Sequence, residues 1–134
     1  MPAVASQLGS FVAALPEAQA TTLRTLAHAW EGGGGRLAVG TVAIRLQFGP
    51  EETPHTAGTL FAKDARLELA RIILEHHGLD ADAWTHWSDE FADLAHHGFD
   101  ASSKFPTLPL QHITATELAR LVTGLRDLAK MVGP

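Results

Sequence analysis

A run of alternating side chains near the middle of the chain sets the strongest limit on its fold. Over residues 42–48, apolar side chains occupy every second position, and Ala, Arg and Gln stand between them. A period of two is typical of a β-strand with one buried face. Leu37 and Val39 stand in the opposite phase, so we expect Gly40 to mark a bulge or bend within one strand over residues 36–48.

This strand needs a partner and a cover. A polar loop with two prolines follows it, and a shorter strand over residues 56–62 is expected to pair with it as an antiparallel hairpin. A two-stranded ribbon is at best marginally stable in water. Shelter could come from a short third strand over residues 110–113 and from helices, or from a second copy of the chain. Arg45 is the only charge between Leu37 and Phe48, and a strand edge with few charges favours pairing between copies.

Helical patterns flank the hairpin on both sides. Apolar residues recur at spacings of three and four over residues 4–15, 17–31 and 115–132, which predicts amphipathic helices. Over residues 64–78 the apolar side chains cover most of the circumference of a helix, so we expect a central, buried helix there. A further helix, capped by an aspartate and closed by a glycine, is expected over about residues 81–97.

These patterns together predict an α+β fold that is mostly helical, with a central antiparallel β-hairpin and room for a short third strand. Thr114 and Glu117 have the spacing of a capping box, which would fix the start of the last helix. The chain has 134 residues, a length that suits one globular domain over residues 1–134.

The composition excludes several classes of function. The chain has no cysteine, so it has no disulfide, no thiol nucleophile and no thiolate zinc site. Its net charge is −5 and its basic residues are scattered, which argues against nucleic-acid binding because such binding needs clustered Lys and Arg. No apolar run is long enough for a membrane span, and the amino-terminal residues lack the basic start of a secretory signal. We therefore expect a cytoplasmic protein that does not bind membranes.

An acidic, histidine-rich segment is the clearest candidate for chemistry. Between residues 75 and 100 there are seven acidic residues, five histidines and no Lys or Arg. One face of the helix expected there carries four metal-ligand types: His86, Glu90, Asp93 and His97. Imidazole and carboxylate groups suit a divalent metal such as Zn²⁺ or Mn²⁺.

These four residues would not all bind one ion, because on one straight helix they span about 16 Å. An adjacent pair such as His86 and Glu90 would need further ligands, and His76 or His77 of the preceding helix could add one. An ordinary solvated helix face has the same composition, so this pattern alone does not establish a metal site. The histidines also suggest a response to pH between 5 and 7.5, because imidazole titrates near pH 6.5.

A run of four glycines, Gly32–Gly35, precedes Arg36. Glycine-rich loops can cradle phosphate groups, but this one lacks the Lys-Ser/Thr of a P-loop and leads into a strand where a phosphate loop would lead into a helix. We expect a flexible connection between helix and strand. The chain has no GxSxG motif and no cysteine, so nucleophilic catalysis has no visible candidate.

The sequence favours a non-enzymatic role. We expect a small cytoplasmic interaction or scaffold protein that self-associates, with a protein partner that the sequence does not identify. The rival hypothesis is a metal-binding protein, which could be hydrolytic, with a His/carboxylate site on the helix around residues 81–97.

Overall fold

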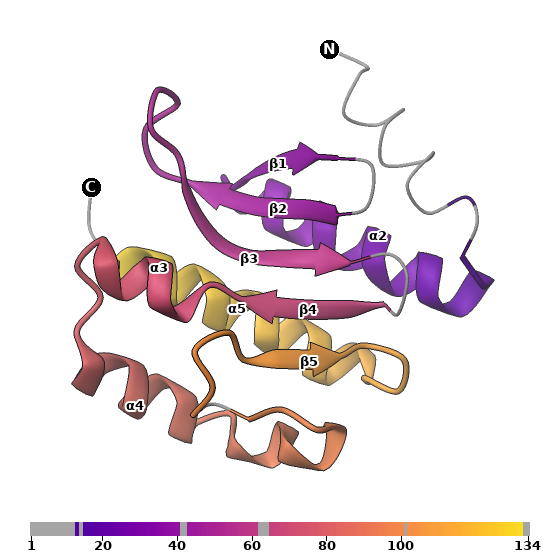
Figure 1. Cartoon of the computed structure of the whole chain (residues 1–134). Coiled ribbons are helices and arrows are strands. Elements are labelled where there is room, and N and C mark those ends of the chain that lie inside the picture. The colour runs from indigo at the N-terminus through magenta and orange to yellow at the C-terminus, as the bar shows by residue number, and fades with distance from the viewer. Residues whose placement is uncertain (1–12, 14, 41–42, 62–64, 101, 133–134) are drawn as a thin grey trace.

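The structure, a computed structural model, describes residues 13, 15–40, 43–61, 65–100 and 102–132, with the side chains at 96 and 97 left out (Figure 1). Its centre is a five-stranded antiparallel sheet in the sequential order β1-β2-β3-β4-β5. The strands are β1 (Arg36–Val39), β2 (Ala43–Phe48), β3 (His55–Phe61), β4 (Arg66–Leu69) and β5 (Thr107–Pro109). The helices are α2 (Glu17–Gly32), α3 (Arg71–His76), α4 (Ala81–Asp89), the 3₁₀ helix η1 (Ala92–His97) and α5 (Ala115–Val132).

Strand register divides the sheet into a buried face and an open face. On the buried face one aliphatic row crosses all five strands, because each of its members lies opposite the next: Val39, Ile44, Leu60, Leu67 and Leu108. On the open face the row beside it is mostly small or polar: Ala38, Arg45, Thr59, Glu68 and Thr107. An antiparallel sheet with this alternation can leave one face to solvent.

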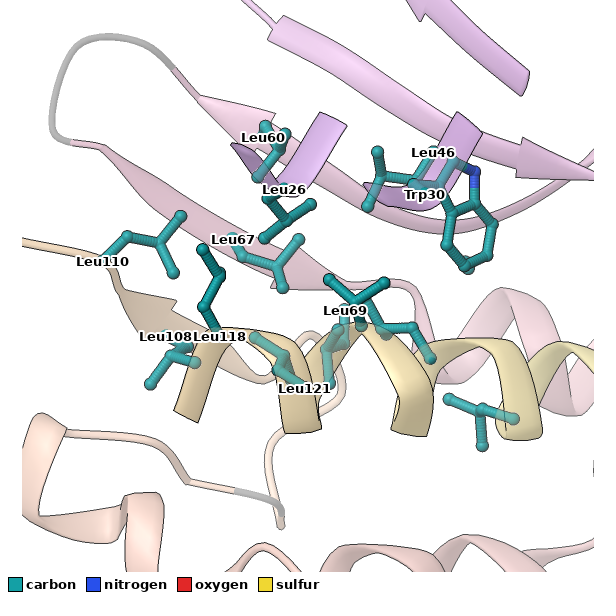
Figure 2. Packing of buried hydrophobic residues seen from close by; sticks show 14 of the residues in the cluster. Leu26, Trp30, Leu46, Leu60, Leu67, Leu69, Leu108, Leu110, Leu118 and Leu121 are labelled. Atoms are coloured by element: carbon teal, nitrogen blue, oxygen red, sulfur yellow. The ribbon is translucent and has the colours of Figure 1, made fainter. Parts of the chain in front are cut away.

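Helices α2 and α5 cover the buried face (Figure 1). Leu26 and Trp30 of α2 and Leu121 of α5 point toward the leucines of the sheet, and the exposed fraction of each is 2% or less (Figure 2). The buried residues form one hydrophobic cluster. In the middle of this face the sheet has Gly58, where a Cβ would lie 3.1 Å from the Leu67 side chain, so the glycine makes room for the neighbouring strand.

Several sequence predictions are confirmed. Helices α2 and α5 occupy the expected segments, and the glycine run connects α2 to β1. The capping box is present: the N–H of Glu117 donates to the hydroxyl of Thr114 over 3.1 Å, and the N–H of Thr114 donates to the carboxylate of Glu117 over 3.0 Å. Strand β3 lies where the second strand of the hairpin was predicted. Of the helices that the structure describes, none has the length and apolar content needed to cross a membrane.

The predicted strand over residues 36–48 is wrong in one respect, because it is two strands. The N–H of Gly40 donates to the carbonyl of Ala43 over 2.8 Å, and the chain reverses between them. The reversal explains the change of phase that suggested a bulge, since Val39 then lies opposite Ile44 on the same face. A register irregularity does occur, but between β2 and β3: the consecutive residues Leu46 and Gln47 pair with Gly58 and Thr56, so Ala57 of β3 has no partner in this pairing.

The third strand was misplaced, and the prediction of a mostly helical chain is wrong. Helices account for just under half of the described residues, and the sheet has five strands. The strand that closes the sheet is β5, where Leu108 pairs with Leu67. The predicted segment, residues 110–113, forms the turn before α5 instead, because the Thr114 cap fixes the start of that helix.

The predicted buried helix over residues 64–78 is also wrong. Its described part divides into β4 and the short helix α3, while residue 64 lies outside the described residues. Leu67 and Leu69 alternate with charged residues and face the core. Ile72 and Ile73 of α3, which were expected to be buried, have exposed fractions of 39% and 38%.

The helix expected over residues 81–97 is interrupted. Helix α4 ends at Asp89, and η1 begins at Ala92 after a turn at Glu90 and Phe91. The helix predicted over residues 4–15 falls almost entirely outside the described residues.

The two faces of the sheet predict opposite responses to truncation at neighbouring positions. Leu60→Ala removes a fully buried side chain from the aliphatic row and is expected to lower the free energy of unfolding by about 2–5 kcal/mol. Thr59→Ala, on the open face of the same strand, should change it by about 0.5 kcal/mol or less. Urea unfolding of both variants measures the difference, and equal losses would contradict this assignment of faces.

Candidate functional site

The predicted metal-binding face retains one close pair. Nε2 of His86 on α4 lies 3.9 Å from Oε1 of Glu90, the residue that follows the helix. Both side chains are open to solvent, with exposed fractions of 83% and 64%. Because both side chains are exposed, their surroundings do not hold them in place. A metal ion bound by this pair would also need ligands from other residues.

Asp93 has a different role from the one predicted. Its two carboxylate oxygens accept hydrogen bonds of 2.9 and 2.7 Å from one guanidinium nitrogen of Arg120 on α5. These hydrogen bonds hold the pKa of Asp93 below its usual value of 3.8. The contact connects η1 to α5. The carboxylate oxygens that a metal ion would use accept hydrogen bonds from the guanidinium instead.

The other predicted ligands do not complete a site. The side chain of His97 lies outside the described residues. His77, which follows α3, contacts His55 at the start of β3, with ring centroids 4.3 Å apart and the rings tilted by 52°, and His76 lies beside His77. Within the described part of the chain, no three His, Asp or Glu side chains are grouped to hold a metal ion. A metal site that uses His86 and Glu90 therefore stays a prediction.

A pocket of about 320 Å³ lies elsewhere, where α2 and α5 end beside the glycine run. Its residues come from four segments: Trp30 in the last turn of α2, the loop Gly33–Gly35, Phe48 at the end of β2, and Arg126, Ala129 and Lys130 of α5. Trp30 is buried, whereas Gly33, Gly34 and Lys130 are exposed. The pocket therefore has an aromatic floor and a mouth formed by the loop and α5.

Each glycine of this loop has a feature that disfavours a side chain. A Cβ at Gly35 would lie 2.6 Å from Cδ1 of the Trp30 indole, and a Cβ at Gly33 would overlap the guanidinium of Arg126. Gly34 has a φ of +98°, a conformation that other residues rarely adopt. The indole N–H of Trp30 donates to the carbonyl of Gln47 over 3.1 Å, which fixes the ring between the loop and β2.

Positive charge gathers at this pocket. Nη2 of Arg126 donates to the carbonyl of Ala29 in the last turn of α2, where a cation also offsets the helix dipole. Nε of the same guanidinium is buried and has no hydrogen-bond partner among the described residues. Lys130 lies four residues further along α5, so the two cations stand on the same side of the helix.

Sequence reasoning missed this site. The glycine run was recognised, but it was interpreted as a flexible connection. The residues that give the loop its shape, Trp30 and Arg126, lie in separate helices, and their sequence spacing carries no motif. Comparison with protein-family models, with curated proteins and with solved structures found no match.

The contact between Asp93 and Arg120 predicts a dependence of stability on pH. Because folding lowers the pKa of Asp93, the contact stabilises the protein above pH 3.8, and this contribution is lost as the pH falls through the lower value of the folded state. Asp93→Asn is therefore expected to have a lower free energy of unfolding than the parent protein at pH 7. This gap between the two free energies should narrow below pH 3.8. The gap should be small and should shrink in salt, because both side chains are about half exposed.

Urea unfolding at several pH values, within the range where both proteins stay folded, measures this gap. A gap for Asp93→Asn that stays constant with pH would contradict the prediction.

The shape of the loop predicts opposite effects for two glycines. Gly35→Ala forces a methyl group against the Trp30 indole and is expected to cost about 1–3 kcal/mol of unfolding free energy. At Gly32, the last residue of α2, a Cβ meets nothing within 4 Å, so Gly32→Ala should be neutral or stabilise by up to about 1 kcal/mol. Urea unfolding compares the two variants, and equal stability would show that the loop tolerates a side chain at residue 35.

Proposed function

We propose that this chain is a non-enzymatic interaction protein that self-associates through the outer edge of β1. The observation that carries the proposal is the position of β1, which lies at the edge of the sheet with only β2 paired to it among the described strands. An open strand edge presents unpaired backbone groups that another strand can use. A cytoplasmic location suits such a protein, because the chain has no cysteine and needs no oxidising compartment.

The hydrogen bond at the β1–β2 turn determines which backbone groups face outward. Gly40 and Ala43 form a bonded pair, and bonded and non-bonded pairs alternate along an antiparallel ladder. Ala38 and Arg36 therefore also face β2. Leu37 and Val39 direct their N–H and C=O groups away from the sheet, toward the side where a further strand would pair.

The residues of β1 itself give this edge little protection. Arg36 is the only charged residue of β1 and the strand has no proline, although charge and proline are the usual guards of an edge strand. The guanidinium of Arg36 donates to the carbonyls of Gly49 and Pro50, over 2.6 and 3.3 Å, at the start of the β2–β3 loop. The one charge of the strand is thereby held by contacts within its own chain.

A two-fold axis at Ala38 fits this edge. Antiparallel pairing of two β1 strands would set Leu37 opposite Val39 of the partner subunit and would satisfy the outward groups of both residues in both copies. The two Ala38 side chains would then lie directly opposite on the open face, as a non-bonded pair with Cα atoms about 4.5 Å apart. Such an interface is the same patch on both subunits, as in most homodimers. A strand of four residues offers few hydrogen bonds, so we expect a dimer that depends on concentration.

A charge at the axis tests the proposal. Ala38→Lys places two ammonium groups opposite each other across the axis and is expected to raise the dimer dissociation constant at least about tenfold. Thr59→Lys adds the same charge to the open face in the middle of the sheet and should leave the dimer intact. Each change brings the net charge of the chain from −5 to about −4, so a general charge effect would favour association in both variants.

Light scattering coupled to size exclusion, at micromolar concentrations and two salt concentrations, measures the mass. Salt should strengthen the dimer of the unmodified chain, because two copies of like net charge repel each other. A parent protein that stays monomeric would refute self-association. Dissociation by Thr59→Lys but not by Ala38→Lys would assign the interface to the open face instead of the edge.

A further inference from the structure

We propose that the pocket beside Gly33–Gly35 binds a small aromatic carboxylate. This proposal concerns a part of the molecule that the β1 edge does not include, and it stands independently of self-association. It rests on three features of the pocket: its apolar walls, its two cations, and a buried guanidinium nitrogen that lacks a partner.

The walls of the pocket fit a flat, apolar body. Trp30 and Phe48 contribute aromatic rings and Ala129 a methyl group, while the indole N–H of Trp30 is already bonded to Gln47. The volume of about 320 Å³ lies at the lower end of the range for ligand sites. A ligand of one or two fused rings would therefore fit, and it would gain mainly from contact with the apolar walls that Phe48 and Ala129 contribute.

The charges of the pocket select an anionic head group. Among the described residues, Arg126 and Lys130 are the only charged ones that line it, and Nε of Arg126 is a buried donor without a partner in the described structure. A buried donor left unpaired costs free energy, and a carboxylate beside this guanidinium would form charge-assisted hydrogen bonds with the group. A neutral ligand would leave this donor unsatisfied, and a cationic one would be repelled.

Two features of the fold oppose an anion, and both are weaker. The carbonyl ends of α2 and α5 point toward this region, and each carries about half a negative charge. Arg126 already offsets part of that charge through the carbonyl of Ala29. The acidic side chains nearest in sequence, Glu31 and Asp127, are exposed and do not line the pocket. Two full positive charges at the pocket therefore outweigh the partial charges of the helix ends.

A matched pair of probes tests the class of ligand. 2-Naphthoate and 2-naphthamide have nearly the same shape, but only the first carries a charge. Calorimetric titration of the full chain is expected to give a dissociation constant below about 100 μM for 2-naphthoate and binding at least about tenfold weaker for 2-naphthamide. Equal binding of the two probes, or none at all, would overturn the proposal. Inorganic phosphate should bind at least about tenfold more weakly than 2-naphthoate, because it makes no use of the aromatic walls, and phosphate binding of equal strength would overturn the aromatic class.

The site is located by nuclear magnetic resonance. The chain has three tryptophans, so the ¹⁵N-labelled protein gives three indole N–H signals. Saturation with 2-naphthoate should shift the signal of Trp30 and leave those of Trp84 and Trp87 in place. A shift confined to the other two indoles would place the ligand elsewhere and would refute the site.

Four variants separate the contributions of charge and shape. Arg126→Gln should abolish binding of 2-naphthoate, and Lys130→Met should weaken it about threefold to tenfold. Ala129→Phe fills the pocket without changing its charge and should also abolish binding. Lys104→Met removes the same charge from an exposed loop outside the pocket and should leave binding unchanged. Full binding by Ala129→Phe, or equal losses in Lys104→Met and Lys130→Met, would overturn the proposal even if Arg126→Gln fails to fold.

Discussion

The fold depends on the burial of a row of five aliphatic side chains, one from each strand. Its members are Val39, Ile44, Leu60, Leu67 and Leu108, which lie opposite one another across the sheet. Burying a side chain of this kind contributes about 1.5–3 kcal/mol relative to leaving it in water, so the row and the helices above it depend on each other. The position of β1 at the sheet edge and that of the pocket at the helix ends both follow from this arrangement.

Much of this fold could be predicted where one local period extends over many residues. The alternation over residues 42–48 and the helical spacing over residues 115–132 each predict the element that is observed. The failures occur where two short elements adjoin. Leu67 and Leu69 belong to a strand and Leu74 to a helix, but read together they resemble one buried helix. Leu67 pairs with Leu60 on one side and with Leu108 on the other, and this pairing makes the segment a strand. No local pattern contains that information.

The candidate site was less accessible to sequence reasoning, because its contacts connect distant segments. Asp93 has the chemistry of a metal ligand, but its carboxylate is bonded to Arg120, which belongs to a different helix. The glycine run is conspicuous in the sequence, yet its cause is the bulk of Trp30 and Arg126 against the loop. Residue types indicate which chemistry is available, whereas the fold determines which groups meet.

The order of the strands has a consequence for how the chain reaches its native state. From β1 to β4, each strand pairs with the one that follows it along the chain, so these contacts close short loops and cost little chain entropy. Among the described strands, β5 alone follows a long connection, which contains α3, α4 and η1. Local contacts of this kind favour rapid folding. The first four strands therefore have the pairings with the lowest cost of loop closure, and the pairing of Leu108 with Leu67 closes a longer loop.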